Sequence, residues 1–336
     1  MADDGVIRAE GLGKKYLIGQ DLAYLLGKLY DNRFTRPIRR SIVRRMASNR
    51  APRWILNRYY RALSYEAKSL FHSRYSKIFR SGDTLMPGEW MIEFLGRHVR
   101  LPLRSSLCWL DWDYALSILG HDADVKQTYE ALIKSDQRPA LFVDVGANYG
   151  THSILFLAVG TPIIAFEPNP ECYPHFQTVC GLNQLDGRWE QSALGKEPGQ
   201  IDLVYPEKET WLGSTSGKVI SRLRSRAVAV KQVPIRMLDD YLDEMPDGEI
   251  LLKLDVEGSE IEVLKGASRL LHSRAPKIIF ESNDRETRLE LFDLLTGFGY
   301  GIYLLPWGQL EETGTLRRDE FFQNHATNFM ANRQPN

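Results

Sequence analysis

The sequence lacks the features that mark secreted and membrane-spanning proteins. Its 336 residues contain three cysteines, Cys108, Cys172 and Cys180, with no C-x-x-C pair and no even framework. A reduced protein is therefore expected rather than a disulfide scaffold. The opening MADDG lacks the basic-then-apolar order of a signal peptide, and no apolar run reaches the length of a membrane span. We expect a cytoplasmic protein without a transmembrane segment.

Two common nucleotide-binding patterns are also absent. No G-x-x-x-x-G-K-S/T occurs, so the loop that cradles the phosphates of ATP is missing. No G-x-G-x-x-G turn occurs either, which argues against a dinucleotide held by its pyrophosphate.

The net charge of zero conceals two regions of opposite charge. Residues 1–80 hold 18 Lys or Arg against 6 Asp or Glu, whereas the remainder holds 25 against 37. This asymmetry indicates two parts with different roles. Within 38–46, apolar residues recur every fourth position among arginines, which is typical of a helix with one apolar face. We expect 21–80 to be mainly helical, with breaks at Pro37 and Pro52, after two short strands within 5–18.

From residue 140 the sequence alternates between short apolar runs and helical patterns. Strands alternating with helices predict an α/β fold, in which a parallel sheet is covered by helices on both faces. Upstream, residues 90–104 indicate a hairpin and 111–133 a mainly helical segment. We expect strands at 141–145, 162–166, 189–194, 250–255, 277–281 and 301–305, helices at 151–159, 170–183, 260–271 and 286–298, and a polar irregular insert at 197–217.

The stretch FVDVGANYGTHSILF, residues 142–156, is a candidate ligand-binding turn. A strand runs into Asp144, small or polar residues follow at Gly146, Asn148 and Gly150, and an apolar helix resumes. Glycines let the backbone approach a ligand closely, and a helix N-terminus follows. The next strand ends in Glu167, 21 residues beyond Gly146, where an acid can accept hydrogen bonds from both ribose hydroxyls. The pattern predicts a nucleoside ligand without a pyrophosphate.

A second polar cluster follows the strand at 250–255. Alternation puts Lys253, Asp255 and Glu257 on one side of the chain where the strand ends. Buried charges without partners are costly, so these side chains should pair with one another or hold a ligand. The less favoured alternative is an ion-paired strand end followed by helix capping at Ser259 and Glu260.

Three stretches, FVDVGANYG, AFEPNP and LLKLDVEGSEIEVLKGA, resemble the FkbM-type S-adenosylmethionine-dependent methyltransferases in order and spacing, over about residues 90–305. The resemblance implies a Rossmann-like seven-stranded methyltransferase sheet, mostly parallel with one late antiparallel strand. It also implies methyl transfer to a hydroxyl of a sugar, glycan or natural product. By the same resemblance, Glu167 holds the ribose of the cofactor and Ser192 and Ala193 lie beside its adenine. The methionine half is bordered by Asp144, Gly146, Ala147, Asn148 and Gly150.

Methyl transfer to oxygen requires positioning and removal of the hydroxyl proton. Asp255 is our candidate base, because it ends a strand where the acceptor must meet the methyl group, and Glu257 and His152 are further candidates. The alternative is a Mg²⁺ ion held by Asp255, Glu281 and Asn283, since oxygen ligands on neighbouring strand ends suit magnesium.

The chain divides into four predicted parts. They are a basic, mainly helical extension (1–80), a hairpin and helical lead-in (81–140), the methyltransferase domain (141–310) and a C-terminal tail (311–336). Residues 5–18 resemble the opening of ATP-binding subunits of polysaccharide-exporting ABC transporters, which favours a glycan acceptor.

The arginine-rich segment 33–80 has three interpretations. It is a solvated helical cap, a peripheral contact with an anionic membrane at the inner face, or a nucleic-acid-binding arm, the last being less favoured. A second function class follows from that segment: a non-catalytic nucleoside-binding protein that uses its basic arm to bind nucleic acid or an anionic membrane surface.

Overall fold

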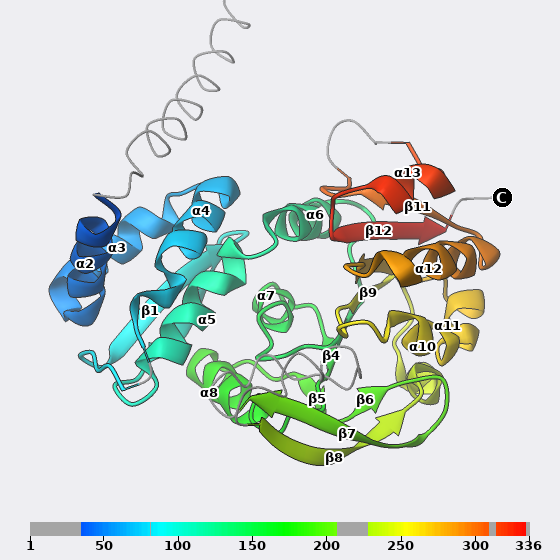
Figure 1. Cartoon of the computed structure of the whole chain (residues 1–336), viewed down its shortest axis with the longest axis horizontal. Helices are drawn as coiled ribbons and strands as arrows, with labels where there is room; N and C mark the ends of the chain where they lie inside the picture. The colour runs from blue at the N-terminus through cyan, green and yellow to red at the C-terminus, as the bar shows by residue number, and fades with distance from the viewer. Residues whose placement is uncertain (1–34, 81, 207–227, 309–313, 334–336) are drawn as a thin grey trace, which may run out of the picture.

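Seven strands form the central sheet of the computed structural model, which describes residues 35–80, 82–206, 228–308 and 314–333. Neighbouring strands are parallel except at β12, which runs antiparallel to both of its neighbours (Figure 1). The predicted Rossmann-like, mostly parallel sheet with one late antiparallel strand is therefore confirmed. In spatial order the strands are β11 (Tyr300–Leu304), β12 (Asn328–Arg333), β10 (Lys277–Glu281), β9 (Ile250–Leu254), β3 (Leu141–Val145), β4 (Ile163–Phe166) and β5 (Arg188–Glu190).

Helices cover both faces of this sheet, as the continuous apolar strands require. Every residue of β3 and β9 is buried. Alternate side chains of β3 enter different cores: Phe142 packs into the core shared with the N-terminal half, and Leu141 and Val143 pack into the other. The first face is covered by α6 (Ala123–Lys134), α7 (Ser153–Ala158) and α8 (Tyr173–Asn183), and the second by α10 (Glu260–Lys265), α11 (Ser268–Ser273), α12 (Arg285–Gly297) and α13 (Arg318–Gln323).

The N-terminal half is helical around one hairpin, as predicted. Three aromatic rings pack at its centre. The ring centroid of Trp90 lies 5.4 Å from that of Tyr60 and 5.0 Å from that of Trp112. Tyr129 then reaches Phe142 of the sheet at 5.6 Å, so one core runs from the hairpin into the sheet. The elements are α2 (Thr35–Ser48), α3 (Arg50–Arg61), α4 (Tyr65–Tyr75), the 3₁₀ turn η1 (Ser76–Ile78), β1 (Gly88–Phe94), β2 (Arg97–Leu103) and α5 (Cys108–Gly120).

The break expected at Pro52 lies three residues earlier. The chain leaves the helix at Asn49, which has extended backbone angles, and Pro52 lies in the first turn of α3, where a missing N–H costs no hydrogen bond. Pro37 lies inside α2, in the first three described residues, and the chain before Thr35 lies outside the described residues. The strands expected within 5–18, and the transporter-like stretch there, lie outside the described residues.

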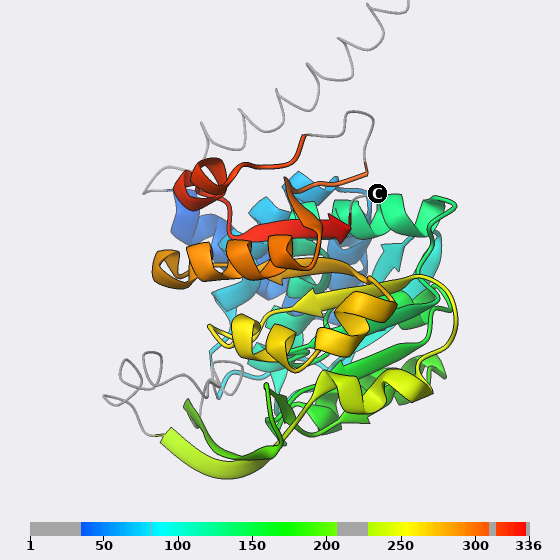
Figure 2. The ribbon, with the colours of Figure 1, turned by 90° about the vertical axis from the view of Figure 1, so that its right-hand side faces the viewer.

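A small second sheet replaces the predicted irregular insert. The expected strand at 189–194 divides into β5 and β6 (Ala193–Leu194), and β6 pairs with β8 (Val228–Arg236), which pairs antiparallel with β7 (Gly199–Pro206). Leu203 and Tyr205 on β7 form a core with Val233, so an alternating apolar pattern was overlooked. Figure 2 shows this sheet at the lower edge of the molecule. Residues 207–217 of the insert lie outside the described residues.

Two further corrections concern the last third of the chain. The helix expected at 260–271 is divided near Gly266, where an added Cβ would lie 2.0 Å from the carbonyl oxygen of Gly195. The strand near 301–305 is not the last, because β12 follows and inserts between β10 and β11. The segment 311–336, expected to be a tail, thus contributes a buried strand to the sheet. Among the described helices, none has the length and apolarity needed to cross a membrane.

Candidate active site

A cavity of about 460 Å³ opens at the carboxyl ends of β3, β4 and β9, where parallel sheets bind ligands. One wall is formed by the strand-end loops, which contribute Gly146, Glu167 and Asp255. The opposite wall comes from the N-terminal half and includes His72, Ser76, Lys77, Asp113, Tyr114, Ser117, His121 and Asp122.

The loop after β3 forms part of the cavity wall made by the strand-end loops. Backbone N–H groups of Gly146 and Ala147 donate to the carbonyl of Phe166 at 2.9 and 3.1 Å, which ties the loop to the end of β4. Gly146 has φ +78°, and an added Cβ would lie 1.8 Å from the carbonyl oxygen of Asp255. Glycine is therefore required here by both conformation and contact. Ala147 and Asn148 also line the cavity.

Two residues of the predicted cofactor set do not line the cavity. Asp144 is fully buried, and its Oδ2 accepts hydrogen bonds from the backbone N–H and the hydroxyl of Ser153 at 3.1 and 2.7 Å. An added Cβ at Gly150 would lie 2.3 Å from the ring of Phe176. Both residues therefore shape the loop and the start of α7 from behind.

Glu167 lies at the end of β4, almost fully buried and facing the cavity. Its two oxygens accept backbone N–H groups of Asn148 and Asn169, both at 2.8 Å. Burial raises the pKa of Glu167 to about 7, although these two hydrogen bonds favour the ionised form. Each oxygen keeps a lone pair for a further donor. Ser192 and Ala193, just beyond β5, line the same cavity.

The polar cluster after β9 is an ion pair next to two more carboxyls. Lys253 Nζ lies 2.9 Å from Asp255 Oδ2, and the lysine side chain is almost fully buried. Burial opposes ionisation of Asp255, but the charge of Lys253 and the hydrogen bonds from Lys253 and Glu281 hold its pKa below the usual range. Burial and the neighbouring Asp255 raise the pKa of Glu281 to about 9. Burial likewise raises the pKa of Glu257.

The carboxylates of Asp255, Glu257 and Glu281 come together within 4.8 Å of one another, as a metal site would require. The third predicted ligand, Asn283, is exposed and outside the cavity lining. The donor atoms suit a hard cation, but the ammonium of Lys253 already neutralises Asp255 and would repel one. The arrangement therefore fits a proton shared between acids better than a bound metal.

His152 reaches the cavity but is fully engaged. Its Nδ1 lies 2.9 Å from the hydroxyl of Tyr129, and its Nε2 lies 3.1 Å from Nζ of Lys126. Burial, together with the charge of Lys126, holds the pKa of His152 well below its usual range. Both ring nitrogens would need to release a partner before accepting a proton from a ligand.

A His–Asp pair that the sequence analysis missed faces the cavity from the opposite wall. Nδ1 of His121 lies 3.0 Å from Oδ2 of Asp122, and 63% of the His121 side chain is exposed. Among the described residues, no hydrogen bond to Nε2 of His121 is present. The hydrogen bond to Asp122 raises the pKa of His121, and the charge of Asp255 adds to the rise. The pair lies between α5 and α6, where no motif marks it.

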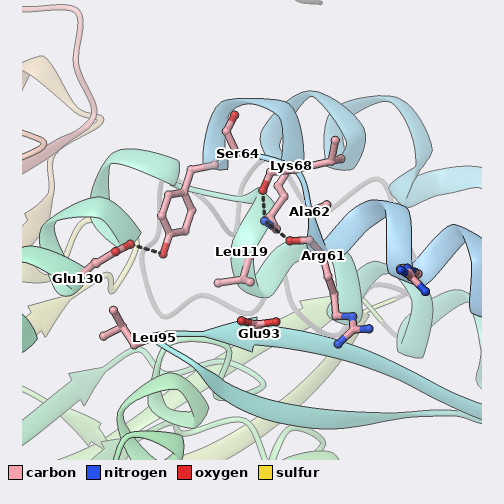
Figure 3. A pocket seen from close by; sticks show the side chains of 11 residues that line it. Arg61, Ala62, Ser64, Lys68, Glu93, Leu95, Leu119 and Glu130 are labelled. Carbon is pink, nitrogen blue, oxygen red and sulfur yellow. Dashed lines mark hydrogen bonds between the residues drawn. The ribbon is translucent and has the colours of Figure 1, made fainter. Parts of the chain in front are cut away.

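A second cavity, of about 520 Å³, lies between α3, α4 and the hairpin (Figure 3). Most of its polar groups form hydrogen bonds or ion pairs with one another. Lys68 Nζ donates to the carbonyls of Arg61 and Leu63, and the hydroxyl of Tyr65 donates to Glu130 at 2.9 Å. Glu93 and Glu130 offset the cations around it. No predicted site residue lies there, so the strand-end cavity remains the candidate site.

Comparison with known proteins agrees with the motifs of the first wall. Residues 144–302 match the family model described as the Methyltransferase FkbM domain. Methyltransferase 1 of Beauveria bassiana is 32% identical over 146 residues, 38% of this chain and 58% of that protein. Methyltransferase sdnD of Sordaria araneosa is 35% identical over 153 residues, 37% of this chain and 59% of that protein. Hexuronic acid methyltransferase AglP of Haloferax volcanii is 28% identical over 156 residues, 42% of this chain and 56% of that protein.

These matches span less than three fifths of each relative's length. His121 and Asp122 precede the region that the family model covers. Family signatures therefore describe the strand-end wall of the cavity and leave the helical wall undescribed.

Proposed function

We propose that the chain is an S-adenosylmethionine-dependent O-methyltransferase, on the premise that residues 144–302 match the model of the FkbM methyltransferase domain. The acceptor in this proposal is a hydroxyl of a sugar, glycan or natural product. The observation that carries it is Glu167, a buried acid at the end of β4 that faces a cavity large enough for a nucleoside. The match to a relative named as a hexuronic acid methyltransferase supports a sugar acceptor.

The cofactor is proposed to lie along the strand-end wall. Glu167 would accept the two ribose hydroxyls on the lone pairs left by its backbone donors. Ser192 and Ala193 would flank the adenine. The methionine half would lie over the loop of Gly146, Ala147 and Asn148, with Asp144 and Gly150 supporting that loop from behind. When bound, S-adenosylmethionine supplies a methyl group on a positively charged sulfur, which leaves as a thioether.

His121 is proposed as the base that takes the acceptor proton. A sugar hydroxyl is a weak nucleophile, and a base within hydrogen-bonding reach assists its attack. His121 lines the cavity, and Asp122 orients its ring from Nδ1, which leaves Nε2 as the nitrogen that would accept the proton. The proton would move from the acceptor oxygen to Nε2 as the new carbon–oxygen bond forms. Asp255, the base predicted from the sequence, is a weaker base because its pKa is lowered by Lys253.

Asp255, Glu257 and Glu281 are proposed to bind acceptor hydroxyls as a group of carboxyls that share protons. The alternative inferred from the sequence is that Asp255 and Glu281 hold Mg²⁺, and a chelator distinguishes the two. Loss of turnover in chelator, restored by added Mg²⁺, would favour the metal.

Calorimetric titration of the purified chain with S-adenosylmethionine tests cofactor binding, and release of S-adenosylhomocysteine in the presence of hexuronic acid glycosides tests transfer. Binding with a 1:1 stoichiometry and acceptor-dependent release are expected. Binding without release on sugars, glycans or small natural products would favour a non-catalytic nucleoside-binding protein, and no binding at all would end the proposal.

A further inference from the structure

Most of the large apolar side chains that the described residues expose to solvent lie on two helices, α2 and α3. Ile38 and Ile42 on α2 are 62% and 53% exposed. Trp54, Ile55 and Tyr59 on α3 are 63%, 57% and 59% exposed. Only three others of this kind occur in the described residues, namely Met86, Tyr173 and Val230. Such a concentration on two helices marks an interaction surface.

These side chains lie on continuous faces. Ile38 and Ile42 are four residues apart, and Val43 and Ala47, on the opposite side of α2, are buried. On α3, Ile55 and Tyr59 are again four apart. Leu56 and Tyr60 form the buried side of that helix. Figure 1 places both helices at the end of the molecule farthest from α11 to α13. We call Ile38, Ile42, Trp54, Ile55 and Tyr59, with the exposed arginines Arg45 and Arg58, the outer surface.

The charge of the outer surface has one sign. Residues 35–61 contain nine arginines and no Asp or Glu. Some of these arginines hold the structure together: Arg53 is buried and donates to the carbonyl of Ala47 at 2.7 Å, and Arg44 lies 2.7 Å from Asp83. Arg36, Arg45 and Arg58 are exposed, and the guanidinium of Arg58 lies 5.8 Å from the ring of Trp54.

We propose that the outer surface docks the protein onto an anionic lipid bilayer. Exposed isoleucines beside an aromatic pair suit insertion at the boundary between headgroups and acyl chains. Trp and Tyr favour that boundary in membrane proteins. Arginines around them meet the negative surface potential of acidic lipids.

Other occupants fit less well. Nucleic acid would use the arginines and the flat rings of Trp54 and Tyr59, but gives no role to three exposed isoleucines. A second copy of the chain would bring the same arginines face to face across a twofold axis, without an acid to pair with them.

The helix that carries Ile38 and Ile42 also contacts the rim of the candidate active site from its other side. Arg40 on α2 donates to the carbonyl of Lys77 at 2.6 Å, and Lys77 lines the strand-end cavity. The docking proposal itself does not depend on the proposed function, because it concerns lipid alone.

The test is co-sedimentation of the full chain with vesicles of phosphatidylcholine alone or mixed with phosphatidylglycerol. Binding should require phosphatidylglycerol and weaken as salt is raised. The double variant Arg45→Gln/Arg58→Gln should lose about 25-fold in affinity, because each arginine near such a surface contributes about fivefold. The pair Ile42→Ser/Ile55→Ser should lose at least about tenfold, because two apolar side chains no longer insert.

Matched controls separate docking from general surface effects. Val230→Ser and Arg269→Gln remove an exposed apolar and an exposed basic side chain elsewhere, and should leave vesicle binding unchanged. Brominated phosphatidylglycerol should quench tryptophan fluorescence. Trp54→Phe should lose most of that quenching while binding vesicles nearly as well, because an aromatic ring remains. Circular dichroism melting of each variant confirms that it is folded.

Several results would overturn the proposal. Equal binding to both vesicle types would remove the electrostatic recognition, and equal loss in Val230→Ser would remove the localisation. If the wild-type chain does not bind vesicles but binds a single-stranded oligonucleotide, and the arginine variant loses that affinity, the surface would be assigned to nucleic acid. A dimer in sedimentation equilibrium that Ile42→Ser/Ile55→Ser dissociates, without vesicle binding, would assign it to self-association.

Discussion

The two walls of the strand-end cavity are built in different ways. The sheet wall is defined by backbone: Gly146 and Ala147 donate to the end of β4, and Glu167 is fixed by two backbone N–H groups. The helical wall is defined by side chains, and its polar residues, such as His121 and Asp113, are only partly buried. The sheet wall thus offers a fixed cradle, whereas the helical wall offers groups that can move and titrate.

Under the proposed function, this difference suits two different ligands. A cofactor that is the same for every member of a family suits a wall set by strand ends and glycine, whose sequence signature is short and recognisable. An acceptor that differs between members suits a wall of replaceable side chains on α4 and α5. In this chain α2, which carries part of the outer surface, also contacts the helical wall through Arg40 and Lys77. If both proposals hold, acceptor choice and membrane docking are functions of the same half of the molecule.

The largest expected effect comes from the helical wall. His121→Gln removes the proposed base while keeping a hydrogen-bonding side chain, so turnover should fall by about 10²–10⁴-fold with cofactor affinity nearly unchanged. Release of S-adenosylhomocysteine and calorimetric titration measure the two quantities. His98→Gln is the matched control, since His98 is also exposed and paired with an acid, Glu93 at 3.3 Å, but lies outside the cavity lining.

The variant Asp255→Asn distinguishes His121 as the base from Asp255, the base predicted from the sequence. If His121 is the base, Asp255→Asn should cost less turnover than His121→Gln, and a chelator should have no effect. A loss of 10²-fold or more in Asp255→Asn, with full turnover in His121→Gln, would return the role of base to the sheet wall.

The next effect concerns the junction between the two walls. Asp111 on α5 is fully buried, and its Oδ1 lies 2.6 Å from Arg104 Nη2 and 3.1 Å from His175 Nε2 on α8. Asp111→Asn should destabilise the protein by about 3–5 kcal/mol, because it breaks a buried ion pair and faces an amide toward donors. Urea unfolding at neutral pH measures the loss. A change below about 1 kcal/mol would mean that the walls are held together by the apolar core alone.

The same variant has a defined pH dependence. Burial opposes ionisation of Asp111, but the hydrogen bonds from His175 and Arg104 hold its pKa below 3.8. A carboxyl with a lowered pKa stabilises the folded state above its unfolded pKa, and that stability is lost as pH falls through the folded value. The difference in unfolding free energy between wild type and Asp111→Asn should therefore shrink below about pH 4. A difference that stays constant into acid would show that the charge of Asp111 does not contribute.

The residues of the sheet wall could be predicted from the sequence far better than those of the helical wall. Strands β3, β4, β9 and β10 are short buried apolar runs between turns, and such runs are recognised from one chain. Spacing cannot separate a residue that faces a ligand from one that supports it, which is why Asp144 and Gly150 were grouped with Gly146. Strand β12 was missed because its run of apolar residues is only three long and follows a polar stretch.

The residues of the helical wall could not be predicted from the sequence, and the reason is different. His121 and Asp122 lie in the turn between two helices, where a polar pair normally marks only a loop. Their position depends on how α5 and α6 pack against the sheet through Tyr129 and Phe142, and that is a tertiary property. The signal that could have drawn attention to them was weak: a histidine beside an acid in a region otherwise rich in apolar residues.

A smaller effect is expected in the cofactor cradle. Glu167→Ala removes the proposed acceptor of two ribose hydrogen bonds, so S-adenosylmethionine binding should weaken by about 2–4 kcal/mol. Glu167 has a raised pKa of about 7, and donors from the ribose favour its ionised form, so affinity should also fall as pH drops below about 7. Calorimetry from pH 8 to pH 6 measures both. Affinity unchanged in the variant would remove Glu167 from the ribose.

The smallest expected effect tests whether Asp122 acts through His121. Activity should fall as pH drops through the pKa of His121, because the protonated ring cannot accept a proton, and Asp122 places that pKa above 6.5. Asp122→Asn removes the charge and the acceptor that raise the pKa of His121, so the acid limb of turnover should move to lower pH. The maximal rate should fall as well, because a base with a lower pKa is weaker. A pH–rate profile of wild type and variant measures the shift. An acid limb that stays in place while only the rate falls would mean that the limb reports another group, and His121 would lose its role as base.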